Sequence, residues 1–366
     1  MTTMKARACA SRTLRLFILL LGAASLLSAQ EGSPIRQSQN GAARDPNDSA
    51  KIHVLPVRGR VYMLVGAGGN ITVQVGDENL FVVDTGYPQM SGEVLAAIRT
   101  ISNKPILFIV DTSADEDHVG GNATISKAGW ALPDENGVAG DLGLSLPSGA
   151  TVIAHLNVLN RMSAATGKEA PAPSVAWPGF TYETIDLKLY NSEPVIIHHM
   201  PAAHTDGDSI VFFRGSDVVS TGDLFSPMHY PAIEVEKGGT VQGTIDALND
   251  IIDLLVPREY EEGGTYVIPG HGRVCDRSQV SNYRDMVTII RDRIQAMLKK
   301  GMTLDQVKAA RPTLDYDGIY GVDTGPWTTT MFIETVYREL SKGNSTPAPR
   351  AVREGSSQGS NEGSSR

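Results

Sequence analysis

Four short clusters of residues able to bind a metal ion lie along the middle of the chain. Imidazole nitrogen and carboxylate oxygen suit Zn²⁺ or a similar first-row ion, and three or four such ligands with one open position form a hydrolytic site. A metal ion there lowers the pKa of bound water from about 15.7 to about 7, which makes hydroxide available at neutral pH. The clusters are Ser113-Ala-Asp115-Glu-Asp117-His118-Val-Gly-Gly, His204-Thr-Asp-Gly-Asp208, Thr-Gly-Asp223 and Pro-Gly-His271-Gly.

Each cluster directly follows a predicted strand, at residues 106–110, 194–199, 217–220 and 265–268 respectively. Side chains that follow several strands can converge at one edge of a sheet, where loops held by a rigid scaffold carry function. Glycines next to the candidate ligands allow the backbone to turn sharply after each strand. This shared placement, more than the number of candidate ligands, predicts a single site.

The elements around these strands indicate an α/β fold. Short β runs separated by turn residues begin the fold as a meander, and the order then becomes mixed α/β. A region rich in Gly and Pro, residues 131–178, is interpreted as an insertion or long loop near the mouth of the site that could act as a lid. Further strands are predicted at 61–65, 71–75, 80–84, 151–154 and 209–213, and helices at 92–101, 241–255, 279–300 and 327–340.

Taken in this order, the clusters resemble the metallo-β-lactamase superfamily, whose usual first motif is His-x-His-x-Asp-His. The resemblance runs from about residue 62 to residue 271 and includes the region of Asn70 and the turn Val83-Asp84-Thr85-Gly86. It implies an αββα sandwich with the metal site at the edge where the two sheets meet.

The resemblance assigns the two halves of a metal centre unequally. Asp117, His118 and His271 match the ligands of the second metal ion, and Asp223 matches the carboxylate that bridges both ions. In the first-metal half only His204 matches a ligand. Ser113 and Asp115 stand at the positions of the two leading histidines of the family motif.

This departure bears on how many ions the chain binds. A serine hydroxyl is a poor Zn²⁺ ligand unless it is deprotonated, whereas Asp115 can coordinate a metal together with His204 and Asp223. We expect one firmly bound Zn²⁺; a second ion, and iron or manganese in place of zinc, stay open. Asp117, His204 and Asp115 are the expected catalytic residues, the last two by orienting the substrate or transferring protons.

Residues close to the clusters have structural interpretations. We expect Ser113 to form a hydrogen bond or a turn, and Asp84 to hold a turn or accept a hydrogen bond that orients a ligand. Cys275 is expected to be a buried, inert thiol. The remaining histidines near the clusters are interpreted as packed or surface residues: His155, His198, His199 and His229.

The N-terminal segment has the layout of a secretory signal: basic residues, an apolar run at 16–27, and then Ser28-Ala29. The run is too short to span a bilayer, so we expect cleavage near Ala29 and a periplasmic or secreted protein. The composition then predicts a disordered linker at 30–52, one metallo-β-lactamase-like domain at 53–340 and a disordered tail at 341–366.

Charge narrows the range of partners. Removing the four basic residues of the signal from a net charge of −9 leaves −13, and the interior has no Lys/Arg cluster. A protein that binds phosphates needs a basic surface, so nucleic acid is excluded as a partner. We expect a small-molecule substrate and no membrane partner after signal cleavage, and the oligomeric state stays open. Only Cys275 remains after cleavage, so no intramolecular disulfide forms.

The function expected from these features is an exported hydrolase that cleaves a small ester, lactone, thioester or amide by metal-bound hydroxide. A β-lactam is an admissible amide substrate, but no residue selects it. Two alternatives stay open. One is a non-catalytic or weakly active metal- or ligand-binding protein whose first metal site has decayed, and the other is an iron-dependent redox enzyme on the same fold.

Overall fold

The structure of the protein is a computed structural model that describes residues 51–131, 149–164, 171–260 and 263–344. All of these ranges belong to one compact unit, Asp45–Arg366. The expected signal sequence at 1–29, nearly all of the expected linker at 30–52 and most of the tail lie outside the described residues. The three remain predictions.

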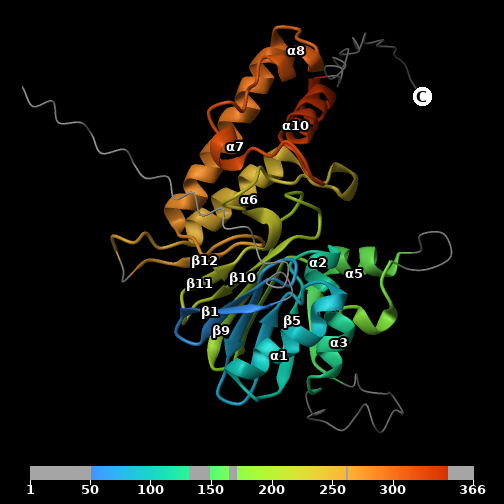
Figure 1. Cartoon of the computed structure of the whole chain (residues 1–366), viewed down its shortest axis with the longest axis vertical. Helices are drawn as coiled ribbons and strands as arrows, with labels where there is room; N and C mark the ends of the chain where they lie inside the picture. The colour runs from blue at the N-terminus through green and yellow to red at the C-terminus, as the bar shows by residue number, and fades with distance from the viewer. Residues whose placement is uncertain (1–50, 132–148, 165–170, 261–262, 345–366) are drawn as a thin grey trace, which may run out of the picture. The chain divides into compact units, whose positions relative to one another are not determined.

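Two β-sheets form the centre of this unit (Figure 1). In the first sheet, β1 to β4 pair antiparallel and β4 to β7 pair parallel. Its strands, in spatial order, are β1 (His53–Arg58), β2 (Val61–Val65), β3 (Ile71–Val75), β4 (Leu80–Val83), β5 (Ile106–Val110), β6 (Thr151–His155) and β7 (Phe180–Tyr182). The second sheet has the order β12 (Tyr266–Ile268), β11 (Val218–Ser220), β10 (Ser209–Phe213), β9 (Glu193–His199) and β8 (Ile185–Tyr190).

Helices cover the outer faces of both sheets. Those that pack on the first sheet are α1 (Ser91–Ile101) and α3 (Asn122–Lys127), and those on the second are α6 (Val241–Leu254) and α7 (Arg277–Lys299) (Figure 1). Helix α10 (Thr329–Asn344) packs against α7 and not on the sheet. The shorter helices are α2 (Glu116–Val119), α5 (Leu156–Ser163), α8 (Leu304–Ala309) and α9 (Asp317–Tyr320), with 3-10 turns η2 (Pro88–Met90), η3 (Ser174–Ala176), η4 (Gly222–Leu224) and η5 (Val235–Lys237). Among the described helices, none has the length and apolar character needed to cross a membrane.

The layer between the sheets follows from the alternation of side chains along each strand. On β4, Phe81 points between the sheets and meets Phe213 of β10 edge to face, with ring centroids 5.6 Å apart. Its neighbours Leu80 and Val82 point to the opposite side and pack with Ile98 of α1. Both faces of β4 are therefore buried, which explains why its sequence is continuously apolar.

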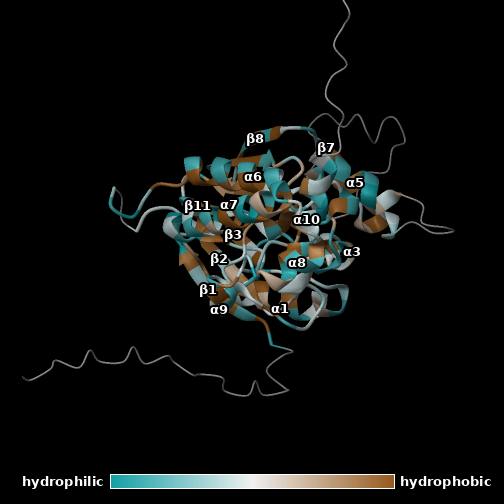
Figure 2. Ribbon diagram, turned by 90° about the horizontal axis from the view of Figure 1, so that it is seen from above, coloured by the Kyte–Doolittle hydropathy of each residue, from teal (hydrophilic) through white to brown (hydrophobic). Residues whose placement is uncertain are grey.

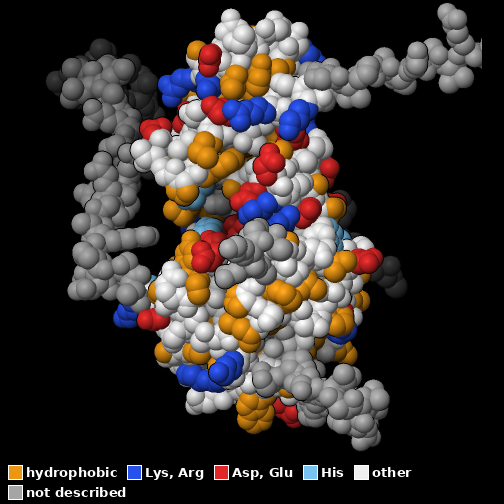
Figure 3. Space-filling model, turned by 90° about the vertical axis from the view of Figure 1, so that its right-hand side faces the viewer, with side chains coloured by type: hydrophobic (Ala, Val, Ile, Leu, Met, Phe, Trp, Pro, Cys, Tyr) orange, Lys and Arg blue, Asp and Glu red, His pale blue; other side chains and the backbone are white. Residues whose placement is uncertain are grey.

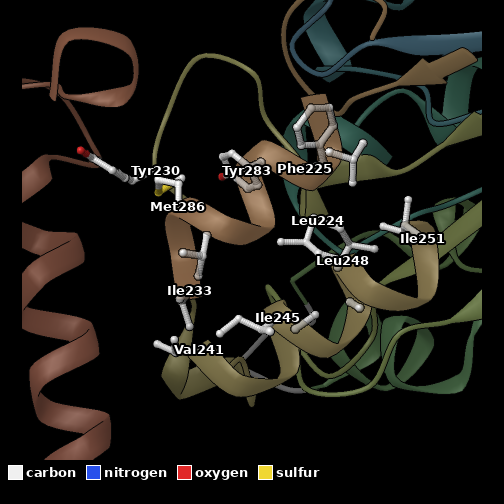
Figure 4. Packing of buried hydrophobic residues seen from close by; sticks show 14 of the residues in the cluster. Leu224, Phe225, Tyr230, Ile233, Val241, Ile245, Leu248, Ile251, Tyr283 and Met286 are labelled. Carbon is white, nitrogen blue, oxygen red and sulfur yellow. The ribbon is translucent and has the colours of Figure 1, made fainter. Parts of the chain in front are cut away.

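The outer face of the second sheet is buried by α6 and α7. The apolar stripe of α6 packs on this face as the sequence predicts, and Figure 4 shows Leu248 of α6 against Leu224. The expected helix start is also present, since the Thr240 side chain accepts a hydrogen bond from the backbone N–H of Gly243. In Figure 2 the outer surface of a peripheral helix such as α5 is largely hydrophilic. Together the layers form the αββα sandwich that the resemblance implies.

The region 131–178 differs from the expected long loop. Its described part contains β6, which the sequence also predicts as a strand, and α5, which it does not. Residues 132–148 and 165–170 of this region lie outside the described residues. A lid in this region therefore remains untested.

Both sheets contribute loops to one edge of the sandwich. Strands β4 and β5 run parallel, as do β11 and β12, so the residues that follow each pair lie at the same end of their sheet. Two backbone hydrogen bonds join the loops of the two sheets there: Ser209 N–H to the carbonyl of Thr112 at 2.9 Å, and Asn70 N–H to the carbonyl of Gly270 at 2.7 Å. The four clusters are thereby brought to one place.

Candidate metal centre

His118 is fully buried at this edge, and its ring is fixed by a carboxylate behind it. Its Nδ1 lies 2.8 Å from Oδ2 of Asp84. Asp84 is in turn held by Thr112, whose backbone N–H and hydroxyl each donate to it at 2.8 Å. With Nδ1 donating to Asp84, the lone pair of Nε2 points away from Asp84 and toward Asp223, whose Oδ2 lies 3.3 Å away. Asp84 thus accepts a hydrogen bond that orients a ligand, as the sequence analysis expects.

The three other predicted ligands of the second metal lie next to His118. Asp117, His118 and His271 place ligand atoms within 4.8 Å of one another. Nε2 of His271 lies 3.1 Å from Oδ2 of Asp117 and 3.5 Å from Oδ1 of Asp223. Asp223 thus faces both imidazoles, one with each carboxylate oxygen. The structure brings together all the residues that the resemblance assigns to the second metal.

These side chains fit a metal ion. Nε2 of His118 is buried and, among the described residues, forms no hydrogen bond, although Oδ2 of Asp223 lies 3.3 Å away. A polar atom left in this state in the interior is costly. Four donors placed about 2.0–2.1 Å from a tetrahedral Zn²⁺ lie roughly 3.3 Å from each other. Three of the donor pairs here are 3.1, 3.3 and 3.5 Å apart. A cation would satisfy the unpaired nitrogen and neutralise the two carboxylates.

Close backbone approach shapes this half of the site. A Cβ atom on Gly270 would lie 2.2 Å from Oδ1 of Asp223, and one on Gly69 would lie 2.8 Å from Cε1 of His118. The side-chain amide of Asn70 donates to the carbonyls of Pro269 and Gly272, at 2.8 and 2.9 Å. Asn70 therefore holds the His271 loop from both sides. The resemblance included the region of Asn70, but the sequence did not predict that this residue holds the His271 loop.

Electrostatic interactions within the cluster raise the pKa values of its histidines and lower that of Asp223. Burial alone would lower the pKa of His118, but the carboxylates of Asp223 and Asp84 raise it well above its ordinary value. The hydrogen bond to Asp117 raises the pKa of His271. Burial alone would raise the pKa of Asp223, but His118 and the other imidazoles hold it far below its usual range. The carboxylates are thus ionised at neutral pH, and a metal ion must displace protons from the histidines.

The first-metal half has a different character. His204 is buried, with Nδ1 3.3 Å from Oδ1 of Asp208 and Nε2 3.7 Å from Oδ2 of Asp115. The Ser113 hydroxyl donates to the same oxygen of Asp115 at 3.2 Å. Burial would lower the pKa of His204, but Asp208 and other nearby carboxylates raise it to about 9. Ser113 therefore forms the expected hydrogen bond, and Asp115 is neither free nor solvated.

Two residues that the sequence did not single out complete this half. Lys237, at the end of η5, places Nζ 2.6 Å from Oδ1 of Asp115 and also forms an ion pair with Glu234. Burial would lower the pKa of Lys237, but these two carboxylates raise it. Asp115, His204 and Glu234 also place ligand atoms within 4.8 Å of one another. No sequence signal links residue 115 to a lysine more than a hundred residues further along.

His155, His199 and Cys275 have structural surroundings. The rings of His155 and His199 stack with centroids 3.5 Å apart, and His199 Nδ1 donates to the carbonyl of Asp208 at 3.0 Å. Burial lowers the pKa of both imidazoles, so the pair packs as neutral rings behind the His204 loop. Cys275 is buried, and burial raises its pKa to about 11, as expected for an inert thiol.

On the face of the molecule shown in Figure 3, exposed histidine atoms lie near the middle, next to a recess. Acidic and basic side chains lie beside them. His271 and Asp117 are only partly buried, whereas His118 lies behind them. The centre is thus open to solvent on one side, as a site for an incoming substrate requires.

The comparisons with known proteins agree with this geometry. The family model of the metallo-beta-lactamase superfamily matches residues 64–271. The chain belongs to this superfamily and has its hydrolase-type αββα fold. A search of curated proteins finds no match.

Solved structures with the same fold include the stereoselective inverting sec-alkylsulfatase Pisa1 from Pseudomonas sp., at 16% identity and a TM-score of 0.56. That match covers 82% of this chain and 54% of the sulfatase, so the chain spans about half the length of that enzyme. DIM-1 metallo-beta-lactamase matches at 15% identity and a TM-score of 0.47, covering 65% of this chain and 97% of the lactamase.

Proposed function

We propose that the protein is a metal-dependent hydrolase, exported from the cytoplasm, that cleaves a small ester, lactone, thioester or amide. The observation that carries the proposal is a cluster of two imidazoles and two carboxylates in which the buried Nε2 of His118 faces Asp223 at 3.3 Å and forms no hydrogen bond within the described part of the chain. A buried arrangement of this kind is costly unless a cation completes it. Asp117, His118, Asp223 and His271 would hold that cation, with zinc the ion that suits them best.

When bound there, a zinc ion supplies Lewis acidity: it polarises a carbonyl group and makes water a nucleophile near neutral pH. The chain contributes the rest. Asp84 fixes the ring of His118 through Nδ1 and so keeps Nε2 directed at the cation. His204, with a pKa raised to about 9, can hold a proton on Nε2 and deliver it to a leaving group. Asp115 lies 3.7 Å from that nitrogen, and its negative charge favours the protonated ring.

Localisation and partners are part of the proposal. The secretory signal predicted at 1–29 supports a periplasmic or secreted protein. The net charge of −9, which becomes more negative after cleavage, supports a small-molecule substrate over nucleic acid. The binding-protein and iron-redox alternatives differ from the hydrolase in metal content and turnover, so one experiment separates all three.

The test is elemental analysis of the full-length mature protein, purified without added metal, together with assays on ester, lactone, thioester, β-lactam and sulfate-ester substrates. We expect about one zinc per chain and hydrolysis of at least one class. His118→Ala is expected to remove the metal and the activity, while His198→Ala, in β9, serves as the matched control. Chains with neither metal nor stabilisation by added zinc would overturn the proposal. Iron, or metal without turnover, would support the two alternatives.

A further inference from the structure

The first-metal half of the centre contains a lysine ammonium where the family motif leads one to expect a cation. We infer that Lys237 replaces the first metal ion, so that the chain binds a single metal ion, in the half formed by Asp117, His118, Asp223 and His271. The inference rests on the proposed function, because it concerns the other half of the same centre. Lys237 is then the residue that decides how many metal ions the chain binds.

Both oxygens of Asp115 are already engaged. Oδ1 accepts a hydrogen bond from Nζ of Lys237 at 2.6 Å, and Oδ2 accepts one from the Ser113 hydroxyl at 3.2 Å. The carboxylate of Glu234 forms an ion pair with the same ammonium. A metal ion bound by Asp115 and Glu234 would have to displace Lys237 from both carboxylates. While Lys237 stays, its positive charge repels a second cation at this point.

The loop that carries Lys237 is fixed to the His204 loop on both sides. The backbone N–H of Glu234 donates to the carbonyl of His204 at 2.9 Å, and the N–H of Asp206 donates to the carbonyl of Lys237 at 2.9 Å. The next residue, Gly238, has φ +85°, and a Cβ there would lie 2.9 Å from Cβ of Asp206. These contacts fix the backbone on both sides of Lys237. The fold therefore positions the ammonium between the two carboxylates.

The position of the ammonium also gives it a use. A lysine ammonium has three N–H donors, and within the described chain two of them are directed at Asp115 and Glu234. The Lys237 side chain is 36% exposed, so its third donor can reach a substrate oxygen from the solvent side. A fixed cation beside the metal site stabilises negative charge that develops on that oxygen. Lys237 then supplies the electrostatic part of what a first metal ion does.

The test counts metal ions per chain and does not depend on activity. Metal-free full-length protein is titrated with Co²⁺, followed by its visible absorption, and zinc is counted by elemental analysis after equilibration and desalting. We expect one equivalent for the wild type and for Lys237→Arg, which keeps the charge. Lys237→Met frees Asp115, Glu234 and His204, so we expect it to approach two equivalents. Adding Asp115→Asn to Lys237→Met is expected to return the count to one.

Two results would overturn the inference. One is a wild-type chain that binds two ions, and the other is a Lys237→Met chain that stays at one ion while its thermal unfolding transition shows that it is folded. If Lys237→Met does not fold, Lys237→Gln repeats the comparison with a polar, uncharged side chain and leaves Asp115, Glu234 and His204 in place. A wild type that binds no metal would count against the proposed hydrolase itself, which keeps the two failures distinct.

Discussion

At the scale of single residues, the centre depends on how one imidazole is held. His118 has no freedom to rotate, because it is fully buried and its Nδ1 is bound by Asp84. Asp84 itself has a φ of +62°, a left-handed conformation that is uncommon for residues other than glycine, although aspartate adopts it more readily than most. Such a conformation persists only where the surroundings enforce it. Here the two hydrogen bonds from Thr112 enforce it and orient the carboxylate.

Asp84→Asn tests this orientation. The amide keeps the shape of the side chain but removes the charge that favours the Nδ1 tautomer, so we expect zinc affinity to fall by about 10- to 100-fold. The measurement is competition for zinc against a chromophoric chelator. Asp217→Asn, which weakens an ion pair with Arg58, is the matched control and is expected to leave affinity unchanged. Equal affinities in the two variants would contradict this role of Asp84.

At the scale of elements, the sequence predicts best the strands that are buried on both faces. The bounds of β2, β3, β5 and β10 agree with those predicted, because continuous or alternating apolar runs mark them clearly. Strand β8 was missed. Its apolar residues Ile185, Leu187 and Leu189 are exposed, whereas Asp186 is buried and accepts a hydrogen bond from the Tyr190 hydroxyl. The alternation typical of a half-buried strand is present in the sequence, but the fold buries the face that carries Asp186 and leaves the apolar face exposed.

The turns after the strands lead to a prediction for Gly270. Because a Cβ atom there would lie 2.2 Å from Oδ1 of Asp223, Gly270→Ala must displace that carboxylate. We expect metal affinity at least about tenfold lower, measured by zinc competition, in a protein that still folds. Gly179→Ala is the control, since no atom of the described residues lies within 4 Å of its added Cβ. Undiminished affinity in Gly270→Ala would show that Asp223 is not a ligand.

At the scale of the whole molecule, the centre connects the two sheets. Asp117 and His118 follow β5 of the first sheet, whereas Asp223 and His271 follow β11 and β12 of the second. A metal ion held by all four residues joins the two halves of the sandwich. Because the ligands come together only in the folded protein, the free energy of binding also stabilises the fold.

Metal removal therefore lowers the thermal stability. Zinc at a free concentration of 100 times its Kd stabilises the native state by about 2.7 kcal/mol, which for a domain of this size raises Tm by roughly 4–5 °C. Differential scanning calorimetry with and without a chelator measures the shift. His118→Ala is expected to show the lower Tm in both conditions. A wild-type Tm that does not respond to the chelator would argue against a metal that bridges the sheets.

The sequence by itself predicted the fold class, and its resemblance to the metallo-β-lactamase superfamily predicted the four residues of the second-metal half, because strand patterns and ligand motifs are both local features of the chain. The tertiary structure decided what surrounds those residues. Asp84 behind His118, Asn70 across the His271 loop and Lys237 against Asp115 are contacts between segments far apart in the chain. Local patterns carry no information about such pairs, since only the packing of the two sheets brings them together. The altered half of the motif was visible in the sequence, but the lysine that lies within it was found only in the fold.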